Sequence, residues 1–206
     1  EGDGIQFLSS SNELIITGRT TKTNSNGDLF LIKTDLSGNI NFSASYEVGS
    51  MGASANSILE TLDSGYIISG TVFLPFEQKS FLLKLNSVFE VQLLKHYISS
   101  LMPPEIDAAN DGGFIIGDMT TVGTYDARLI KTDINGFSGC NESNNLAVKK
   151  VFSPPVVTLT PVVHTGGIDS SFVPVVSAIS PVKTVYCNGY VCNNKPNAGI
   201  SPSSSS

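Results

Sequence analysis

The sequence is poor in charge and contains no tryptophan. Lys, Arg, Asp and Glu make up only 15% of its 206 residues, and the formal net charge is −6. Binding to a phosphate backbone requires a clustered basic surface, so we expect no nucleic-acid partner. No apolar run approaches the roughly 20 residues that a transmembrane helix requires, so we also expect no membrane span.

Cysteine and histidine are equally rare, with three and two copies. The cysteines form no CxxC pair and lie far in sequence from His96 and His164, which argues against a zinc site. Cys187 and Cys192 flank the short segment NGYV, and a disulfide between them would close a small loop. A disulfide between Cys140 and Cys187 is the alternative, and it would tie the C-terminal segment to the rest of the chain.

Sequence motifs for catalysis are missing as well. There is no GxSxG, HExxH or Walker loop, and His96 falls on an expected strand, where a partly exposed structural side chain is favoured over a general base. We therefore expect a protein that is not an enzyme and has no cofactor. Several acidic residues recur at equivalent positions, which indicates turn capping and not a unique active site. They are Asp28, Asp35, Asp63, Asp111, Asp126 and Asp133.

Calcium is the one ion that these turns leave open. The segments DLSGN and DINGF offer oxygen ligands. Both lack the alternating donors and the final Glu of an EF-hand loop, so the sequence does not predict a calcium site.

A short apolar strand motif occurs three times along the chain, as ELIITG, GYIISG and GFIIGD. A second apolar motif follows each copy, and both keep the same register at a period of about fifty residues, which identifies an internal repeat. The near-continuous apolar character of both motifs is typical of strands buried on both faces. The predicted core residues on these strands are Ile15, Ile16, Leu31, Ile32, Ile67, Ile68, Leu82, Leu83, Ile115, Ile116, Leu129 and Ile130.

Turn-forming residues divide the repeats, at about 1–50, 51–99 and 100–140, into four short strands each. Four strands in a repeat of this length are typical of a β-propeller blade, and a plain β-sandwich is the alternative. The third repeat is incomplete, because GCNESNN stands where its fourth strand would be. A closed propeller needs at least four blades. The sequence therefore predicts further blades, from other chains or from the rest of a longer polypeptide.

The segments DGGFIIG and ARLIKTDINGFSGC in the third repeat carry a family resemblance. They resemble the repeat β-propellers of large secreted or cell-surface Bacteroidota proteins, many of them exported by the type IX system. The resemblance covers residues 1–140 and is looser in the second repeat, where NSVFE replaces the Asn-Gly turn. It implies an extracellular or outer-surface location.

Composition changes after Asn145, where Val, Pro, Ser and Thr dominate up to the Ser-rich end. Prolines confine such segments to sheet edges or polyproline-like paths. We expect residues 141–206 to form an extended tail that packs against the repeats or against a neighbouring molecule. One hypothesis is that the tail adds an edge strand between subunits of a large assembly.

The sequence thus predicts an all-β protein with about three β-propeller-like repeats and an extended tail. The expected function is structural or adhesive, at or outside the cell surface, through contacts with other protein chains. This step rests on the resemblance and on the missing catalytic motifs, because a fold does not fix a function. The alternative is a module that binds polysaccharide or protein within a larger extracellular enzyme or uptake complex.

Overall fold

The computed structural model describes residues 2–21, 23, 25–99, 103–120, 126–140 and 142–154. All regular secondary structure in these residues is β-strand, which confirms the all-β prediction. None of the described residues belongs to a helix that could cross a membrane.

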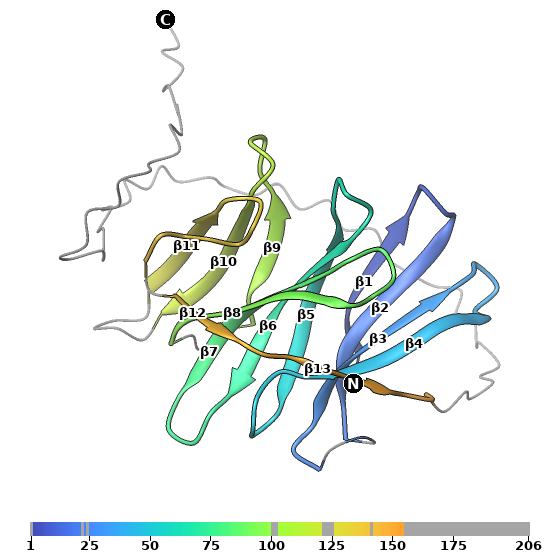
Figure 1. The fold of residues 1–206 in the computed structure, drawn as a ribbon, viewed down its shortest axis with the longest axis horizontal. Helices are drawn as coiled ribbons and strands as arrows, with labels where there is room; N and C mark the ends of the chain where they lie inside the picture. The colour runs from blue at the N-terminus through green and yellow to red at the C-terminus, as the bar shows by residue number, and fades with distance from the viewer. Residues whose placement is uncertain are drawn as a thin grey trace, which may run out of the picture.

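The strands form three antiparallel sheets that lie side by side (Figure 1). The first sheet has the order β1-β2-β3-β4-β13, the second β12-β8-β7-β6-β5, and the third β11-β10-β9. The first sheet contains β1 Gly2–Leu8, β2 Glu13–Thr20, β3 Asp28–Thr34, β4 Ile40–Glu47 and β13 Val148–Val151. The second contains β5 Ala53–Glu60, β6 Tyr66–Phe73, β7 Gln78–Leu85, β8 Val91–Ser99 and β12 Glu142–Asn145. The third contains β9 Glu105–Ala108, β10 Phe114–Thr120 and β11 Asp126–Thr132.

The repeated motif occupies the second strand of each sheet, where β6 is buried along nearly its whole length. Gly70 on β6 shows how closely the backbones approach there. A Cβ atom on Gly70 would lie 2.1 Å from the carbonyl oxygen of Ser54 on β5 and 2.6 Å from the ring of Phe81 on β7. The glycine that ends GYIISG is therefore required by packing on both sides.

The second sheet is covered on both faces because it lies between two apolar cores. Ile68 and Leu83 belong to the core shared with the first sheet. Ile67 and Leu82 belong to the core shared with the third sheet. Successive residues of a strand point to opposite faces, so one Ile-Ile pair supplies both cores.

Two of the predicted core residues are not buried. Ile115 is 38% exposed and Leu129 is 79% exposed. Both point away from the second sheet, and the described residues place no sheet against that face. Ile16, Ile32 and Ile130 are half-buried. The other seven predicted core residues, Ile15, Leu31, Ile67, Ile68, Leu82, Leu83 and Ile116, are fully buried.

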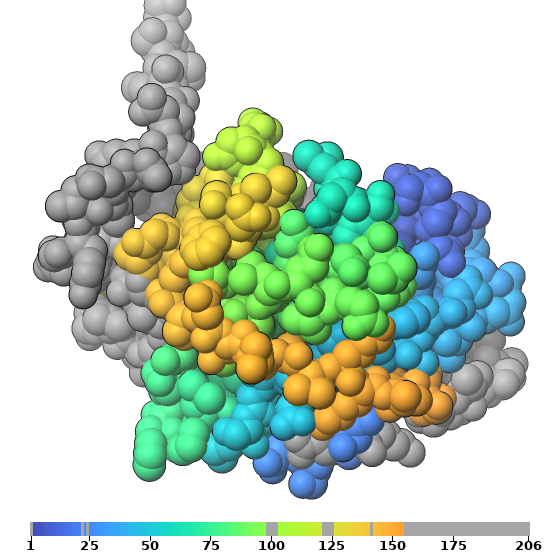
Figure 2. Space-filling view, viewed as in Figure 1, coloured from blue at the N-terminus to red at the C-terminus, as the bar shows by residue number. Residues whose placement is uncertain are grey.

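Residues 142–151, which we call the strap, run back across the molecule from the third sheet (Figures 1 and 2). Their strand β12 pairs with β8 of the second sheet, and β13 pairs with β4 of the first sheet. The start of the predicted tail therefore packs against the repeats of its own chain. Strand exchange between subunits stays a hypothesis, and residues 155–206 lie outside the described part.

Candidate functional site

Each sheet carries a row of three aliphatic side chains across its first three strands. Cross-strand pairing places the members of a row directly beside one another on one face. The row of the first sheet points away from the second sheet, and the other two rows point toward the preceding sheet. The rows are Ile5, Ile16 and Ile32; Ile58, Ile68 and Leu83; and Ile106, Ile116 and Ile130.

The burial of the rows differs in one respect. Ile58 and Ile106 are buried at 3% and 6% exposure, whereas the equivalent Ile5 is 66% exposed. Beside Ile5 on the same strand and face, Phe7 is 50% exposed. We call Ile5, Phe7, Ile16 and Ile32 the open face of the first sheet. It repeats the apolar surface that is buried at both internal contacts between sheets.

The turn after the third strand has the same hydrogen bonds in every repeat. The side chain of Asp35 accepts from the backbone N–H groups of residues 37 and 39 at 2.9 and 2.8 Å. Asn86 and Asp133 do the same in the second and third repeats. The residue three places after this acceptor always has a positive φ, namely Gly38 at 85°, Phe89 at 62° and Gly136 at 75°.

A tyrosine from the preceding sheet reaches two of these turns. The hydroxyl of Tyr46 on β4 donates to the Phe89 carbonyl at 2.9 Å. The hydroxyl of Tyr97 on β8 donates to the Gly136 carbonyl at 2.8 Å. Burial raises the pKa of both phenols, so each keeps the proton that it donates. The equivalent Gly38 carbonyl receives no hydrogen bond from the described residues.

Replacing Tyr97 by phenylalanine is expected to lower the free energy of unfolding by about 1–2 kcal/mol. The substitution keeps the ring but leaves the buried Gly136 carbonyl without its donor. Urea unfolding followed by circular dichroism measures the change. Tyr66→Phe is the matched control, because none of the hydrogen bonds between described residues uses the Tyr66 hydroxyl. Equal losses in the two variants would contradict the assigned role.

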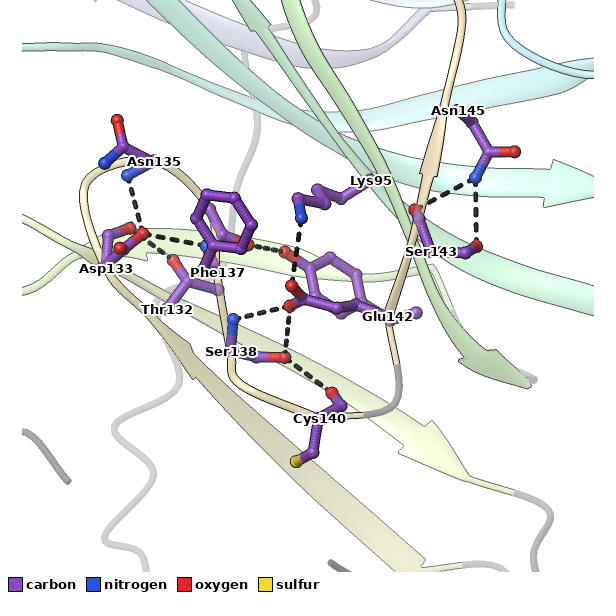
Figure 3. A network of polar contacts seen from close by, with 12 residues as sticks. Lys95, Thr132, Asp133, Asn135, Phe137, Ser138, Cys140, Glu142, Ser143 and Asn145 are labelled. Carbon is purple, nitrogen blue, oxygen red and sulfur yellow. Dashed lines mark hydrogen bonds and ion pairs between the residues drawn. The ribbon is translucent and has the colours of Figure 1, made fainter. Parts of the chain in front are cut away.

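A buried ion pair holds the start of the strap (Figure 3). The Lys95 ammonium lies 3.0 Å from Glu142 Oε1, and the two side chains are only 2% and 13% exposed. Glu142 Oε2 accepts from the backbone N–H and the hydroxyl of Ser138 at 2.6 and 2.7 Å. Lys95 also lies 3.6 Å above the ring of Phe137. The strap is thus fixed to the second sheet and to the turn of the third.

Polar and aromatic contacts hold the other end of the strap. Lys150 pairs with Glu47 at 2.7 Å and with the buried carboxylate of Asp28 at 3.2 Å. Just beyond the strap, the ring of Phe152 packs against Phe30 with centroids 5.8 Å apart. Asp28 lies on β3 and binds the strap, and it also accepts a hydrogen bond at 2.7 Å from the hydroxyl of Thr23, in the turn before β3.

The contact between the second and third sheets contains a second buried ion pair. Asp118 on β10 accepts two hydrogen bonds from the Arg128 guanidinium on β11. Ser80 of the second sheet donates to the same carboxylate. The positions equivalent to this pair are Gly18 and Phe30 in the first sheet, and Gly70 and Phe81 in the second. The third repeat has therefore exchanged a glycine and a phenylalanine for two opposite charges.

His96 is buried, so the expectation of a partly exposed side chain is wrong. It lies on the β8 face that packs against the first sheet, where its Nε2 atom has no partner among the described residues. Burial lowers the pKa of His96 to about 4, the positive charge of Lys79 adds to the effect, and a hydrogen bond with the Val48 backbone opposes it. A neutral, buried imidazole in this setting is a packing group.

Stability is expected to fall as the pH drops from 6.5 to about 4, because of His96. The unfolded chain binds this proton near pH 6.5 and the folded chain only near pH 4, so the stabilisation is complete above that window and lost below it. The integrated loss is about 3 kcal/mol. The free energy of unfolding of His96→Gln should therefore change less with pH across this range, as measured by urea unfolding at each pH. Glu13 contributes little to this fall above pH 4.5, because its pKa is lowered from 4.5 to about 2 and its own loss lies between these two values.

Of the other predicted turn caps, Asp63 accepts a hydrogen bond from the backbone of Gly65 in its own turn, and Asp126 is the first residue of β11. Asp35, Asp111 and Asp133 accept hydrogen bonds from backbone N–H groups of their own turns, as predicted. Within the described part of the chain, no three His, Cys, Asp or Glu side chains gather in a way that could hold a metal ion. Cys187 and Cys192 lie outside the described residues, so both alternative disulfide pairings stay predictions.

No protein-family model matches the chain, and no curated protein is significantly similar to it.

Proposed function

We propose that the chain is a non-catalytic structural module in which the three sheets are successive blades of a larger β-propeller-like assembly. Further blades, from other chains or from the rest of a longer polypeptide, cover the outer faces. The open face of the first sheet carries this proposal. Its Ile5 is 66% exposed, whereas the equivalent Ile58 and Ile106 are buried at the contacts between sheets.

The outer face of the third sheet supports the same proposal. Ile115 and Leu129 occupy the positions of Ile67 and Leu82, which are fully buried in the core between the second and third sheets. Exposed apolar side chains gathered on a sheet face are a common sign of a protein contact. Both ends of the stack therefore expose apolar side chains whose equivalents are buried at the internal contacts between sheets.

We further propose that this assembly is located outside the cell or on its outer surface and has a structural or adhesive role. The support is the resemblance of the repeats to those of secreted Bacteroidota proteins. In this proposal the buried ion pairs and tyrosine hydroxyls have a structural role, because each one described above joins two sheets or holds the strap.

Hydrogen exchange tests the assembly. The chain alone is compared with the native protein purified from the cells that produce it. Peptides from β1, β2, β10 and β11 should exchange more slowly in the native protein, because neighbouring blades cover them there. Peptides from β6 and β7 serve as the internal control, since both faces of the second sheet are already buried. Equal exchange of the outer sheets in the two samples would contradict the proposal.

A further inference from the structure

Resting on the proposed function, we infer that the open face of the first sheet accepts one particular partner. This partner is a complete four-stranded β-blade whose outermost strand donates a tyrosine hydroxyl to the Gly38 carbonyl. Two features of the first sheet define the site. One is the exposed end of the aliphatic row at Ile5, together with the neighbouring Phe7, and the other is the turn formed by residues 35–39.

The two internal contacts give the pattern that the site repeats. In each, the aliphatic row of the later sheet packs against the earlier sheet, and a tyrosine of the earlier sheet binds the turn carbonyl of the later one. The first sheet has the row, the turn and the positive φ of Gly38. It therefore has the features that the later sheet supplies in both internal contacts, and it could form a third contact of this kind with a preceding blade.

The identity of residue 38 indicates which internal contact is the closer template. The turn of the second repeat has Phe89, whose ring stacks between Phe42 and Tyr66. The turn of the third repeat has Gly136, where a Cβ atom would lie 2.8 Å from Leu82 and 3.0 Å from Leu93. The first repeat also has glycine, although a Cβ on Gly38 would meet nothing within 4 Å. Gly38 thus matches a partner with leucines at the positions of Leu82 and Leu93.

The third sheet of a second copy of the chain does not meet these requirements. Its described part ends at β11 and has no fourth strand to carry the tyrosine. Its outer face places Asp107 beside Ile115 and Glu105 beside Gly117, whereas the second sheet has Leu59 and Ser57 at the positions of the two acids. The partner is therefore a blade like the second repeat.

The strap sets one border of the site. Phe152 covers Phe30 and reduces its exposure to 8%. In the second sheet the equivalent Phe81 is fully buried in the core shared with the first sheet. The incoming blade consequently has to cover the part of the face formed by β1 and β2, and not the part next to β4.

A tandem chain provides the probe. A copy of residues 51–101 is placed directly in front of Glu1, which preserves the spacing between Tyr97 and the next aliphatic row. Exchange of β1 and β2 amides should slow by about tenfold or more, as expected when an exposed strand becomes part of a packed core. When phenylalanine replaces the copied Tyr97, exchange of these amides should become about fivefold faster, which corresponds to the loss of one hydrogen bond. The copied Tyr66→Phe is the matched control and should change nothing.

Each outcome has one meaning. Unchanged exchange of β1 and β2 in a folded tandem overturns the inferred partner, even if the native protein shows the protection expected for a larger assembly. Protection that is insensitive to the copied tyrosine overturns the hydrogen bond to Gly38. If β1 and β2 are protected in the tandem chain but not in the native protein, the proposed function is contradicted. The open face would still be shown to bind a blade of this kind.

A second variant keeps the inference testable if the added repeat does not fold. Asn is one of the few residues that tolerate a positive φ, and Gly38→Asn has open space in the chain alone, so its unfolding midpoint there should fall only slightly. In the native protein the added side chain would meet the partner blade, and protection of β1 and β2 should fall. Unchanged protection in the native protein would overturn the inference.

Discussion

Replacing Asp118 by alanine is expected to lower the free energy of unfolding by about 3–5 kcal/mol, which is the usual cost of breaking a buried ion pair. The Asp118 side chain is fully buried, and that of Arg128 is only 13% exposed. Removal of the carboxylate would take away the two hydrogen bonds that it accepts from the guanidinium and the acceptor of the Ser80 hydroxyl. Urea unfolding measures the loss.

The equivalent positions of the other repeats provide the control. Combining Asp118→Gly with Arg128→Phe recreates the Gly70–Phe81 pair of the second sheet. Replacement of a buried ion pair by apolar groups of similar size is often neutral or stabilising. The double variant should therefore recover most of the stability that Asp118→Ala loses. If the double variant is as unstable as Asp118→Ala, the ion pair is not the interchangeable element that the repeat implies.

Replacing Lys95 by methionine is expected to cost a similar amount, about 3–5 kcal/mol, and to loosen the strap. The substitution keeps the aliphatic stem but removes the charge that compensates Glu142 in a nearly buried position. It also removes the cation from the face of Phe137. Hydrogen exchange in residues 142–151 should accelerate together with the fall in unfolding midpoint.

Lys149 offers a matched control on the strap itself. Its partner Glu90 has a side chain that is 60% exposed. Ion pairs in such solvent-exposed positions contribute less than about 1 kcal/mol, so Lys149→Met should leave strap exchange nearly unchanged. A similar response to both substitutions would show that burial does not decide the strength of the attachment.

The sequence predicts the strands well, because the repeat supplies two anchors in constant register. It predicts less about which apolar residues are buried. Ile115 and Ile116 are chemically identical neighbours, yet only Ile116 meets the second sheet. A repeat pattern describes a residue's place within its own sheet. It does not say whether another sheet follows, so it cannot distinguish Ile115 and Leu129, which are exposed in the chain alone, from their buried equivalents.

The polar contacts could not be predicted from local pattern. Lys95 stands in the apolar segment LLKHYI, and the only signal of its burial is that one charge interrupts a strand. Its partner Glu142 lies 47 residues further along the chain. Asp118 and Arg128 could have been noticed by aligning the repeats, since they replace Gly70 and Phe81 at equivalent positions.

The strap also affects the order in which the chain can fold. The three repeats are built from neighbouring strands, whereas the hydroxyl of Ser43 donates to the carbonyl of Phe152, 109 residues later. Contacts between such distant residues form late, because the entropy of closing a long loop is lost before they stabilise anything. During synthesis, β4 and β8 are therefore unprotected sheet edges until the strap emerges. Such edges pair readily with other chains, so the period before strap docking is when a growing chain would be most prone to aggregate.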